Sequence, residues 1–449
     1  MVLVLTVVIL QSISFSNYAL TTKTTNIIYG SAPYLTFDGG RTRVTNTEAL
    51  LGISLSDGRT FTPTTNDSSD NPIELPVEGQ SFADIGMLVP TDTDSIALSS
   101  LIGTPYNYWG DDDGDGQGVN GVTATGSLYL SIADKDNNPV ARNKVPTICK
   151  APYKLTLSNG EGRLTTRYGV PNESRFSASN ATYYIKPKTA PAICFARPNL
   201  DEGRYISAAV WNRNKGFLTQ SVTPSSYGLN FPTTGAHNLY FDLDISGNNQ
   251  ALSWAPVSHG GITATMTDST STSVRVTLTG PVATPSQWSS DNPGRIDSLS
   301  LPQVFELVGR DSSGNAVVKY GFKLKQWFVH RGNRNQYSAS SASYWCNRIG
   351  GYRLPKVRDL TNAKSGMVGC QSATPSPSTN YYSRYIGAGL FTEWGKTPYY
   401  AGANFGTYVY WTNDVFNNSN RLCVVSTHGR VYTAPRENTL GTFGLCVYP

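Results

Sequence analysis

The sequence YWCNRIGGYRLPKVRDL, residues 344–360, combines more local structural signals than any other stretch of the chain. Its first half predicts a helix, because the apolar residues in and just before it recur at i, i+3, i+4 and i+7 on one face: Ala342, Trp345, Cys346 and Ile349. Gly350 and Gly351 supply the left-handed conformation that ends such a helix. The residues before Pro355 are expected to be extended, and the proline begins a second short helix. The stretch therefore predicts helix, stop, strand and helix, in that order.

This order of elements resembles a C-type-lectin-like domain, and the resemblance covers residues 326–449. Its further marks are the dipeptide Trp394-Gly395, the strand YVYWTND at 408–414 and four cysteines. The fold implied for this third of the chain is α+β. The family's calcium-binding sugar motifs do not occur in the long loop at 361–407, so calcium-dependent sugar binding in the family's manner is not expected.

Composition and length indicate a secreted, mainly β protein of about three domains. Only 15% of the 449 residues are charged, and long helical patterns are almost absent. Residues 1–19 combine a short apolar run with small residues suited to cleavage, so they are read as a signal peptide that directs export to the cell surface or medium. No later stretch approaches the ~20 apolar residues that a membrane-spanning helix needs.

Two further regions show the short alternating strands and turn clusters of β-sandwiches. Residues 20–200 are read as an N-terminal sandwich, with a turn at 136–139. Residues 201–325 are read as an immunoglobulin-like sandwich, with a turn at 311–315. The expected architecture is thus tandem β-sandwiches followed by the C-type-lectin-like domain at 326–449.

The six cysteines fit an oxidising compartment. Near-identical phrases, PTICKA at 146–151 and PAICFA at 191–196, favour a disulfide between Cys149 and Cys194. The other four cysteines allow three pairings by themselves. The lectin-like resemblance selects one of these pairings, Cys346 with Cys446 and Cys370 with Cys423.

Charge is unevenly distributed. Residues 326–449 contain twelve lysines and arginines against four acidic residues, whereas the rest of the chain is slightly acidic. This excess has two readings, either general solubility or attraction to anionic partners at a cell or matrix surface.

The strongest metal signal is WGDDDGDGQG at 109–118. Asp111, Asp113 and Asp115 alternate before a glycine, as in the opening of an EF-hand-type loop, and clustered carboxylates suit Ca²⁺. The loop lacks the glutamate at its twelfth position, where Val122 stands. A calcium-binding loop and a solvated acidic turn both remain open.

A tyrosine-rich region of the lectin-like part is the expected recognition surface, because tyrosine offers rigid contact area with a polar tip. The predicted binding residues are Tyr381, Tyr382, Arg384, Lys396, Tyr399 and Tyr400. No metalloprotease, nucleophile-elbow or P-loop motif occurs, so no catalytic residue is predicted.

Stacked immunoglobulin-like domains before a lectin-like domain resemble the passenger of intimin and invasin adhesins of enteric bacteria. The phrases at 128–157 and 168–176 are also similar to a domain of large intimin-like surface proteins. The resemblance implies non-catalytic attachment to a host-cell surface protein or glycan. The family's outer-membrane barrel is absent from the sequence, so the chain is either a companion that docks onto a separate intimin-like barrel protein or a piece of a longer adhesin. The rival functions are a glycan-binding lectin module and a secreted hydrolase.

Overall fold

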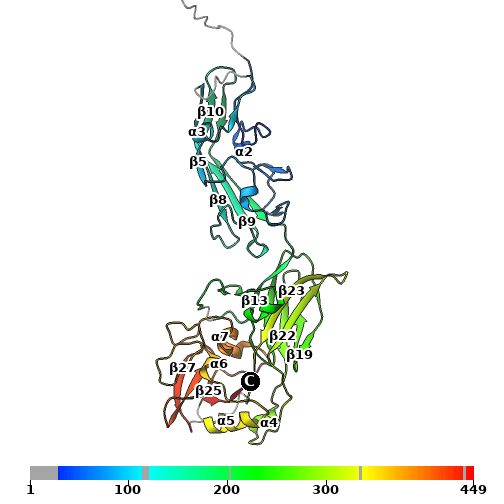
Figure 1. Cartoon of the computed structure of the whole chain (residues 1–449), viewed down its shortest axis with the longest axis vertical. Coiled ribbons are helices and arrows are strands. Elements are labelled where there is room, and N and C mark those ends of the chain that lie inside the picture. Colours follow the sequence, from blue (N-terminus) through cyan, green and yellow to red (C-terminus); the bar gives the residue numbers. More distant parts are fainter. Residues whose placement is uncertain (1–28, 114–120, 202–203, 333–335, 438–440) are drawn as a thin grey trace, which may run out of the picture. The chain divides into compact units, whose positions relative to one another are not determined.

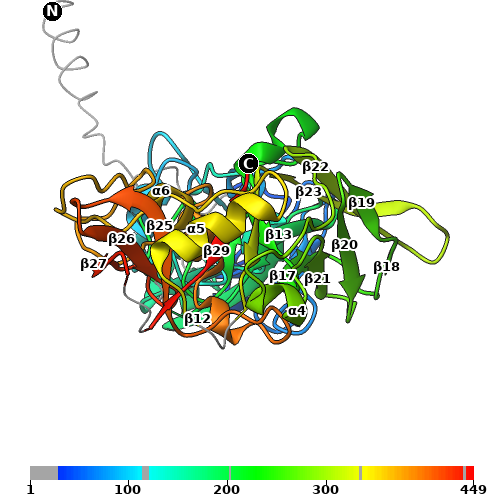
Figure 2. The same ribbon diagram turned by 90° about the horizontal axis from the view of Figure 1, so that it is seen from below.

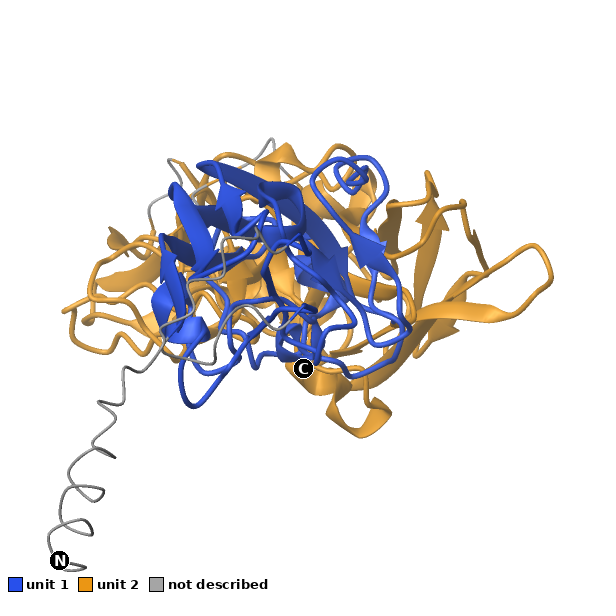
Figure 3. Ribbon diagram, turned by 90° about the horizontal axis from the view of Figure 1, so that it is seen from above, with its two compact units in different colours: residues 1–188 blue, residues 189–449 orange. Residues whose placement is uncertain are grey.

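A computed structural model describes residues 29–113, 121–201, 204–332, 336–437 and 441–449, and the fold is mainly β. The chain divides into two compact units, unit 1 at residues 1–188 and unit 2 at residues 189–449 (Figures 1 and 3). The predicted signal peptide, 1–19, lies outside the described residues. None of the described helices has the length and apolar character needed to cross a membrane.

Unit 1 is a β-sandwich with short connecting helices. Its larger sheet has the order β4-β12-β9-β8-β5, and a three-stranded sheet has the order β11-β10-β7. The strands of these two sheets are β4 (Ile73–Glu74), β5 (Ser95–Ala97), β7 (Val122–Thr125), β8 (Ser127–Ala133), β9 (Tyr153–Asn159), β10 (Gly162–Thr166), β11 (Glu173–Phe176) and β12 (Ser179–Lys186). The remaining elements are β1 (Tyr34–Leu35), α2 (Thr47–Leu50), β2 (Ile53–Ser54), β3 (Thr60–Phe61), η1 (Phe82–Asp84), α3 (Leu98–Leu101), β6 (Trp109–Gly110) and η3 (Ile148–Lys150).

Alternation in the sequence explains the central strands of unit 1. Along β8, Leu128, Leu130 and Ile132 are buried, whereas Tyr129 between them is exposed. Successive side chains of a strand point to opposite faces, so one face of the sheet packs on the core while the other meets solvent. The core of unit 1 extends from Leu35 to Ile185 and consists only of residues of this unit.

The first part of unit 2 is a second β-sandwich. A seven-stranded sheet has the order β14-β15-β13-β17-β21-β20-β19, and a three-stranded sheet has the order β18-β22-β23. Their strands are β13 (Ala192–Arg197), β14 (Trp211–Asn212), β15 (Gly216–Leu218), β17 (Leu239–Ser246), β18 (Ser253–Trp254), β19 (Val257–His259), β20 (Ile262–Thr267), β21 (Ser273–Thr279), β22 (Gln303–Arg310) and β23 (Ala316–Leu324). Two short helical elements accompany them, η4 (Pro224–Leu229) and α4 (Pro285–Ser289).

The second part of unit 2 contains the stretch at 344–360. Helix α5 (Ala339–Arg348) begins at the cap Ser338, whose side chain accepts from the amide of Ser341, and it ends before Gly350 and Gly351, both with positive φ. Its neighbours are β16 (Thr234–Ala236), β24 (Gln326–His330), α6 (Val357–Leu360), α7 (Leu390–Trp394), η5 (Thr397–Tyr399), β25 (Val409–Val415), β26 (Asn420–Val425), β27 (Val431–Pro435), β28 (Thr442–Phe443) and β29 (Leu445–Tyr448). Figure 2 shows α5 running beside β25 and β29, which it contacts.

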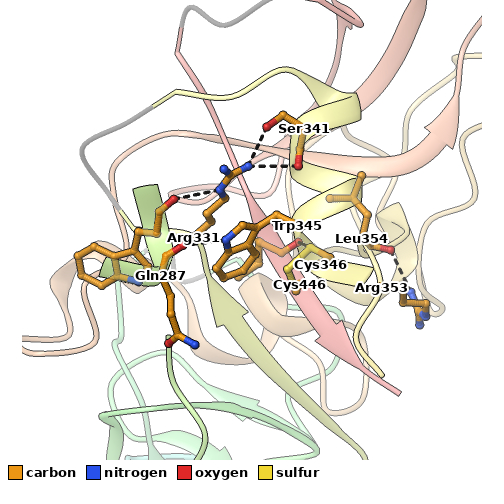
Figure 4. Close-up of a disulfide and its surroundings, with 10 residues drawn as sticks. Gln287, Arg331, Ser341, Trp345, Cys346, Arg353, Leu354 and Cys446 are labelled. Carbon is orange, nitrogen blue, oxygen red and sulfur yellow. Dashed lines mark hydrogen bonds between the residues drawn. A yellow bond between two sulfur atoms is a disulfide. The ribbon is translucent and has the colours of Figure 1, made fainter. Parts of the chain in front are cut away.

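One disulfide ties α5 to the last strand, as the lectin-like resemblance implies. Cys346 on α5 is bonded to Cys446 on β29, and neither residue is accessible to solvent (Figure 4). Beside it, Trp345 donates from its indole nitrogen to the carbonyl of Gln287 at 2.9 Å, and Arg331 donates to the carbonyl and hydroxyl of Ser341. Because Gln287 lies on α4, these contacts join the helix to the sandwich part.

The two parts of unit 2 share a single core, which runs from Ile193 to Val447. Strand β16 of the sandwich part pairs in parallel with β24, and β24 pairs with β29. The predicted boundary at residues 325/326 therefore falls inside one compact unit. The predicted boundary at 200/201 also differs from the division after residue 188, because β13 pairs with β15 and β17 of unit 2.

A buried carboxylate strengthens the junction within unit 2. Glu393 on α7 is inaccessible to solvent and accepts from the amides and hydroxyls of Thr233 and Thr234 at 2.6–3.1 Å, and from the amide of Gly387 at 2.8 Å. Burial raises the pKa of Glu393, and these donors act against that shift. The carboxylate thus connects α7 to the residues that lead into β16.

The expected disulfide between Cys370 and Cys423 is wrong for this structure, in which both are free thiols. Cys423 lies on the central strand β26, where its thiol donates to the carbonyl of Tyr432 at 3.5 Å and burial raises its pKa to about 12. Cys370 ends a turn, and its thiol lies 3.8 Å from the hydroxyl of Ser372. Cys149 lies on η3 of unit 1 and Cys194 on β13 of unit 2, and the bond between them stays a prediction.

Candidate functional site

The structure divides the six predicted binding residues into two groups. Tyr382, Arg384 and Tyr400 are buried, with exposed fractions of 2%, 0% and 3%. A receptor cannot reach these side chains, so their assignment to the binding surface is corrected. Tyr399 is 57% exposed, and Tyr381 and Lys396 are partly exposed.

Arg384 connects three segments inside unit 2. Its Nη1 donates to the carbonyls of Thr392 and Glu393, and its Nη2 donates to the carbonyls of Asn199 and Asp201. Such a buried cation needs partners, and here four carbonyl oxygens supply them.

The residues around Arg384 also help to fix its position. The guanidinium lies over the ring of Trp211 at 4.7 Å. A Cβ at Gly395 would overlap Arg384, and Gly395 also has a φ of +75°, so glycine is required there for space and for backbone conformation. The Trp-Gly pair noted in the sequence therefore serves packing.

Tyr400 and Tyr382 serve the core in the same way. The hydroxyl of Tyr400 donates to the carbonyl of Trp394 at 2.7 Å and accepts from the amide of Asn199, while burial raises its pKa. The hydroxyl of Tyr382 donates to the carbonyl of Thr427 at 3.2 Å. Both rings are amphipathic, so the aromatic body packs inside while the hydroxyl satisfies the backbone of a neighbouring loop.

Tyr381 occupies a different environment, with two guanidiniums close to its ring. Arg204 lies 4.3 Å from the centre of its ring and Arg430 lies 5.6 Å from it. The ring of His428 meets Tyr381 edge-on at 5.2 Å, and Arg430 also lies over the ring of Tyr432 at 4.9 Å. We call Arg204, Tyr381, Arg430 and Tyr432 the arginine–tyrosine surface.

A hollow of about 470 Å³ lies beside this surface, with Arg204 in its wall. One side consists of residues 204–206 and Arg213, and the other consists of residues 376–379 and Ser383. Tyr205 and Ile206 are large apolar residues that remain exposed there, at 45% and 37%. The hollow thus combines arginines, hydroxyl groups and exposed apolar surface.

Asn362, which follows α6 in the sequence and is fully buried, stabilises one wall of the hollow. Its side-chain amide donates to the carbonyls of Pro375 and Ser383, and its oxygen accepts from the amide of Ser383 at 3.0 Å. The hydroxyl of Ser376 donates to the Asn362 carbonyl. Arg384 supports the opposite wall, since its amide donates to the carbonyl of Arg204 at 2.8 Å.

The charge of this surface is uncompensated. None of the ion pairs among the described residues includes Arg204, Arg213 or Arg430. By contrast, Lys396 pairs with Asp201 at 3.7 Å and lies 5.4 Å from the ring of Tyr399. The arginine–tyrosine surface therefore offers cations that are available to a partner, whereas Lys396 already has a carboxylate beside it.

Sequence reasoning missed Arg204, Arg213 and the two apolar residues between them. It placed a domain boundary at 200/201 and treated the following residues as part of a separate sandwich. A usable signal was present, because an exposed Arg-Tyr-Ile phrase in a polar loop is typical of recognition surfaces.

The predicted calcium loop is only partly described. Asp111 and Asp113 lie in the described part, and Asp115 lies outside it. Asp113 accepts from the amide of Ser31 at 2.5 Å, and the intervening Asp112 forms an ion pair with Arg43. Among the described residues no group of three acidic, histidine or cysteine side chains is arranged to hold a metal. Calcium binding by this loop stays a prediction.

Comparison with known proteins finds similar solved structures. The chain is 14% identical to invasin, a bacterial integrin-binding protein, with a TM-score of 0.37; the match covers 73% of this chain and about half of that one, 51%. A 282-residue C-terminal fragment of intimin, solved with the intimin-binding domain of the translocated intimin receptor, is 12% identical with a TM-score of 0.34, over 72% of this chain and 93% of the fragment. An intimin mutant of EHEC O157:H7 is 12% identical with a TM-score of 0.30, over 53% of this chain and 92% of that one. No family model and no curated protein matches the chain.

These likenesses are too distant to carry an assignment of function. What the chain does has to be argued from its own residues.

Proposed function

We propose that the protein is a secreted or surface-associated adhesin-like protein that binds a receptor on a cell surface without catalysis. The receptor contacts the arginine–tyrosine surface and the hollow beside it. The β-sandwiches act as spacer and docking module. This proposal agrees with the intimin and invasin resemblance of the sequence.

The observation that carries the proposal is that Tyr381 lies close to two guanidiniums that form no ion pair among the described residues, next to a hollow with exposed apolar residues. Arginine and tyrosine are the residue types most enriched where binding energy concentrates in interfaces. Arginine also forms bidentate hydrogen bonds with carboxylates and phosphates, which a lysine cannot match. The surface therefore suits a partner that presents acidic groups beside apolar or aromatic groups.

The partner class that fits best is an acidic protein segment. Tyr205 and Ile206 offer apolar contact area, and the three unpaired arginines offer positive charge around it. Hydroxyl groups line the other wall, so an acidic glycan is the second candidate. Attraction between opposite charges would raise the association rate and make it depend on salt.

Binding of the full chain to host cells or matrix proteins tests the proposal. Replacing Tyr381 with Ala should weaken binding about 30-fold, since removing a central aromatic residue typically costs about 2 kcal/mol. Arg204→Gln and Arg430→Gln should each weaken binding and reduce its dependence on salt.

Tyr399→Ala is the matched control, because Tyr399 is exposed but its neighbour Lys396 is already paired with Asp201. Equal losses for Tyr381→Ala and Tyr399→Ala would move the binding surface elsewhere. A glycan array separates the two partner classes, and a pull-down from bacterial outer membranes tests docking onto a barrel protein.

A further inference from the structure

We propose that unit 1 contains a second binding site, in which Arg142 receives the carboxylate of an acidic sugar residue. The site lies in a hollow of about 450 Å³, and its residues all belong to unit 1. It is therefore independent of the arginine–tyrosine surface, and either proposal can fail without the other.

Arg142 is unusual because it is buried but forms no ion pair within 4.0 Å among the described residues, although the charges of Asp94 and Asp92 act on it. Its exposed fraction is 7%, and none of the ion pairs among the described residues includes it. A buried charge is normally paired, because removing it from water is costly. An anion from outside the chain would supply acceptors for the N–H groups of Arg142 that remain without one.

The hydrogen bonds of Arg142 leave one edge of its guanidinium without an acceptor. Nη1 donates to the carbonyls of Val89 and Pro90, at 2.8 Å and 2.5 Å. Nε is buried and has no acceptor, and no hydrogen bond from Nη2 is found among the described residues. The Nε and Nη2 edge of a guanidinium matches the two oxygens of a carboxylate. Burial also lowers the pKa of Arg142, and the negative charges of Asp94 and Asp92 act against that shift.

The residues around Arg142 restrict the ligand to a single negative charge. Asp92 and Asp84 line the same hollow, so a dianion such as a phosphate monoester would meet repulsion. These carboxylates, and the backbone carbonyls nearby, are acceptors for hydroxyl groups. A ligand with one carboxylate and several hydroxyls fits this combination.

Aromatic side chains form the apolar wall. Tyr106, Tyr108 and Phe37 line the hollow, and the rings of Tyr106 and Tyr108 lie 5.6 Å apart. The hydroxyl of Tyr106 is held by Asp92 at 3.2 Å, which fixes the ring at the rim. Aromatic faces pack against the C–H groups of a sugar ring, so a uronic or sialic acid residue fits better than an extended peptide, for which the hollow presents no open strand edge among the described residues.

The test uses the full chain and ligand-observed saturation-transfer NMR. Methyl glucuronide is the probe, and methyl glucoside is its uncharged match. Methyl glucuronide should receive saturation, and methyl glucoside should receive much less. Arg142→Lys keeps the charge but removes the forked edge, and binding should fall about ten- to hundred-fold, as expected for loss of charge-assisted hydrogen bonds.

Two further variants keep the test interpretable. Thr91→Trp places a large ring at the exposed rim without touching the hydrogen bonds of Arg142, and it should block binding even if Arg142→Lys proves unstable. Arg175→Gln removes an exposed arginine that pairs with Glu173, and it should leave binding unchanged. Equal saturation of both sugars, or binding that survives both Arg142→Lys and Thr91→Trp, would overturn the proposal.

A third probe separates the sugar from a peptide. An N-acetylated dipeptide with a free carboxylate should bind more weakly than methyl glucuronide. If the dipeptide alone binds, and its binding needs Arg142, the site recognises a peptide terminus and the acidic-sugar assignment is wrong.

Discussion

Units 1 and 2 are both built on β-sandwiches, but they are stabilised in different ways. Unit 1 relies on alternating strands around one apolar core and contains a single cysteine and no histidine. Unit 2 combines two predicted domains around one core and adds an internal disulfide, a buried carboxylate and all four histidines. The difference teaches that residues 326–449 do not form an independent domain, because they share one core with the sandwich part of unit 2.

Charge follows the same division. Unit 1 has 14 lysines and arginines against 18 acidic residues, a net charge of −4, whereas unit 2 has 22 against 13, a net charge of +9. Among the described residues of the basic unit, Arg204, Arg213 and Arg430 form no ion pair. Among those of the acidic unit, Arg142 is buried and forms none either. The two proposals accordingly assign different anions to the two units, an acidic protein segment to unit 2 and a small, singly charged sugar to unit 1.

Removing the disulfide should give the largest effect. The bond closes a loop of 100 residues, so replacing both Cys346 and Cys446 with Ala should lower the free energy of unfolding of unit 2 by about 4 to 5 kcal/mol. Tryptophan fluorescence during denaturation reports mainly on unit 2, which contains seven of the eight tryptophans. Cys370→Ala is the control, since it removes a thiol without removing a cross-link.

The same experiment tests the shared core. The sandwich and lectin-like parts of unit 2 should lose structure together, in one transition, while unit 1 stays folded. Separate transitions for the two parts would mean that they are independent domains, as the sequence alone predicts.

Glu393→Gln should give the next largest effect. The amide group of glutamine would turn one acceptor oxygen into a donor, facing donors from Thr233, Thr234 and Gly387. Since unmade hydrogen bonds to a buried group are costly, unit 2 should lose roughly 3 kcal/mol. Glu306→Gln is the matched control, because Glu306 is partly exposed on β22 and its loss should cost far less. Similar losses for both variants would show that the hydrogen bonds of Glu393 contribute no more to the stability of unit 2 than those of a partly exposed carboxylate.

Local signals predicted the parts of this structure that depend on neighbouring residues. Helix α5, the glycine stop after it and the turns at 136–139 and 311–315 follow from spacing and turn chemistry alone. The link from Cys346 to Cys446 needed the family resemblance, because spacing left three pairings open.

The candidate binding surface was harder to predict, because the exposure of side chains in loops follows no regular spacing in the sequence. Tyr381 and Tyr382 are adjacent in sequence, yet one lies at the surface and the other is buried. The fate of Arg384 is decided by carbonyls at Asn199 and Asp201, more than 180 residues away. Such contacts depend on how unit 2 packs, and the residues next to Arg384 in the sequence do not indicate them.

Acid should weaken unit 2 selectively. Burial lowers the pKa of His330 to about 4, from an ordinary value near 6.5, and its Nδ1 accepts from the amide of Gly332. A lowered histidine pKa contributes stability that is present above pH 6.5 and is lost as the pH falls through 4. Between pH 6.5 and pH 5 the loss should be about 2 kcal/mol.

His330→Gln keeps an acceptor for Gly332 and should flatten this dependence. Because burial also lowers the pKa of His237, a small slope in the same direction should remain. Unit 1 has no histidine and should change little over this range. An unchanged slope in His330→Gln would assign the acid sensitivity to other groups.

The smallest expected difference in stability concerns a type of turn that occurs once in each unit. In unit 1, Asp134 accepts from the amides of Asp136 and Asn138. In unit 2, Asp311 accepts from the amides of Ser313 and Asn315 in the same geometry. The fourth residue of each turn has a positive φ, at Asn137 and Gly314.

The two turns differ in burial, so the same substitution should not have the same effect. The side chain of Asp134 is only 2% exposed, and Asp134→Ala would remove the acceptor of two amides and leave an unfilled buried position, for a loss of about 1.5 kcal/mol in unit 1. Water can replace the carboxylate of Asp311, which lies at the surface, so Asp311→Ala should cost less. Thermal unfolding of both variants, followed by circular dichroism, measures the two losses. If Asp311→Ala costs as much as Asp134→Ala, the hydrogen bonds within the turn decide its stability and burial does not, and the contrast between the two units would not extend to their turns.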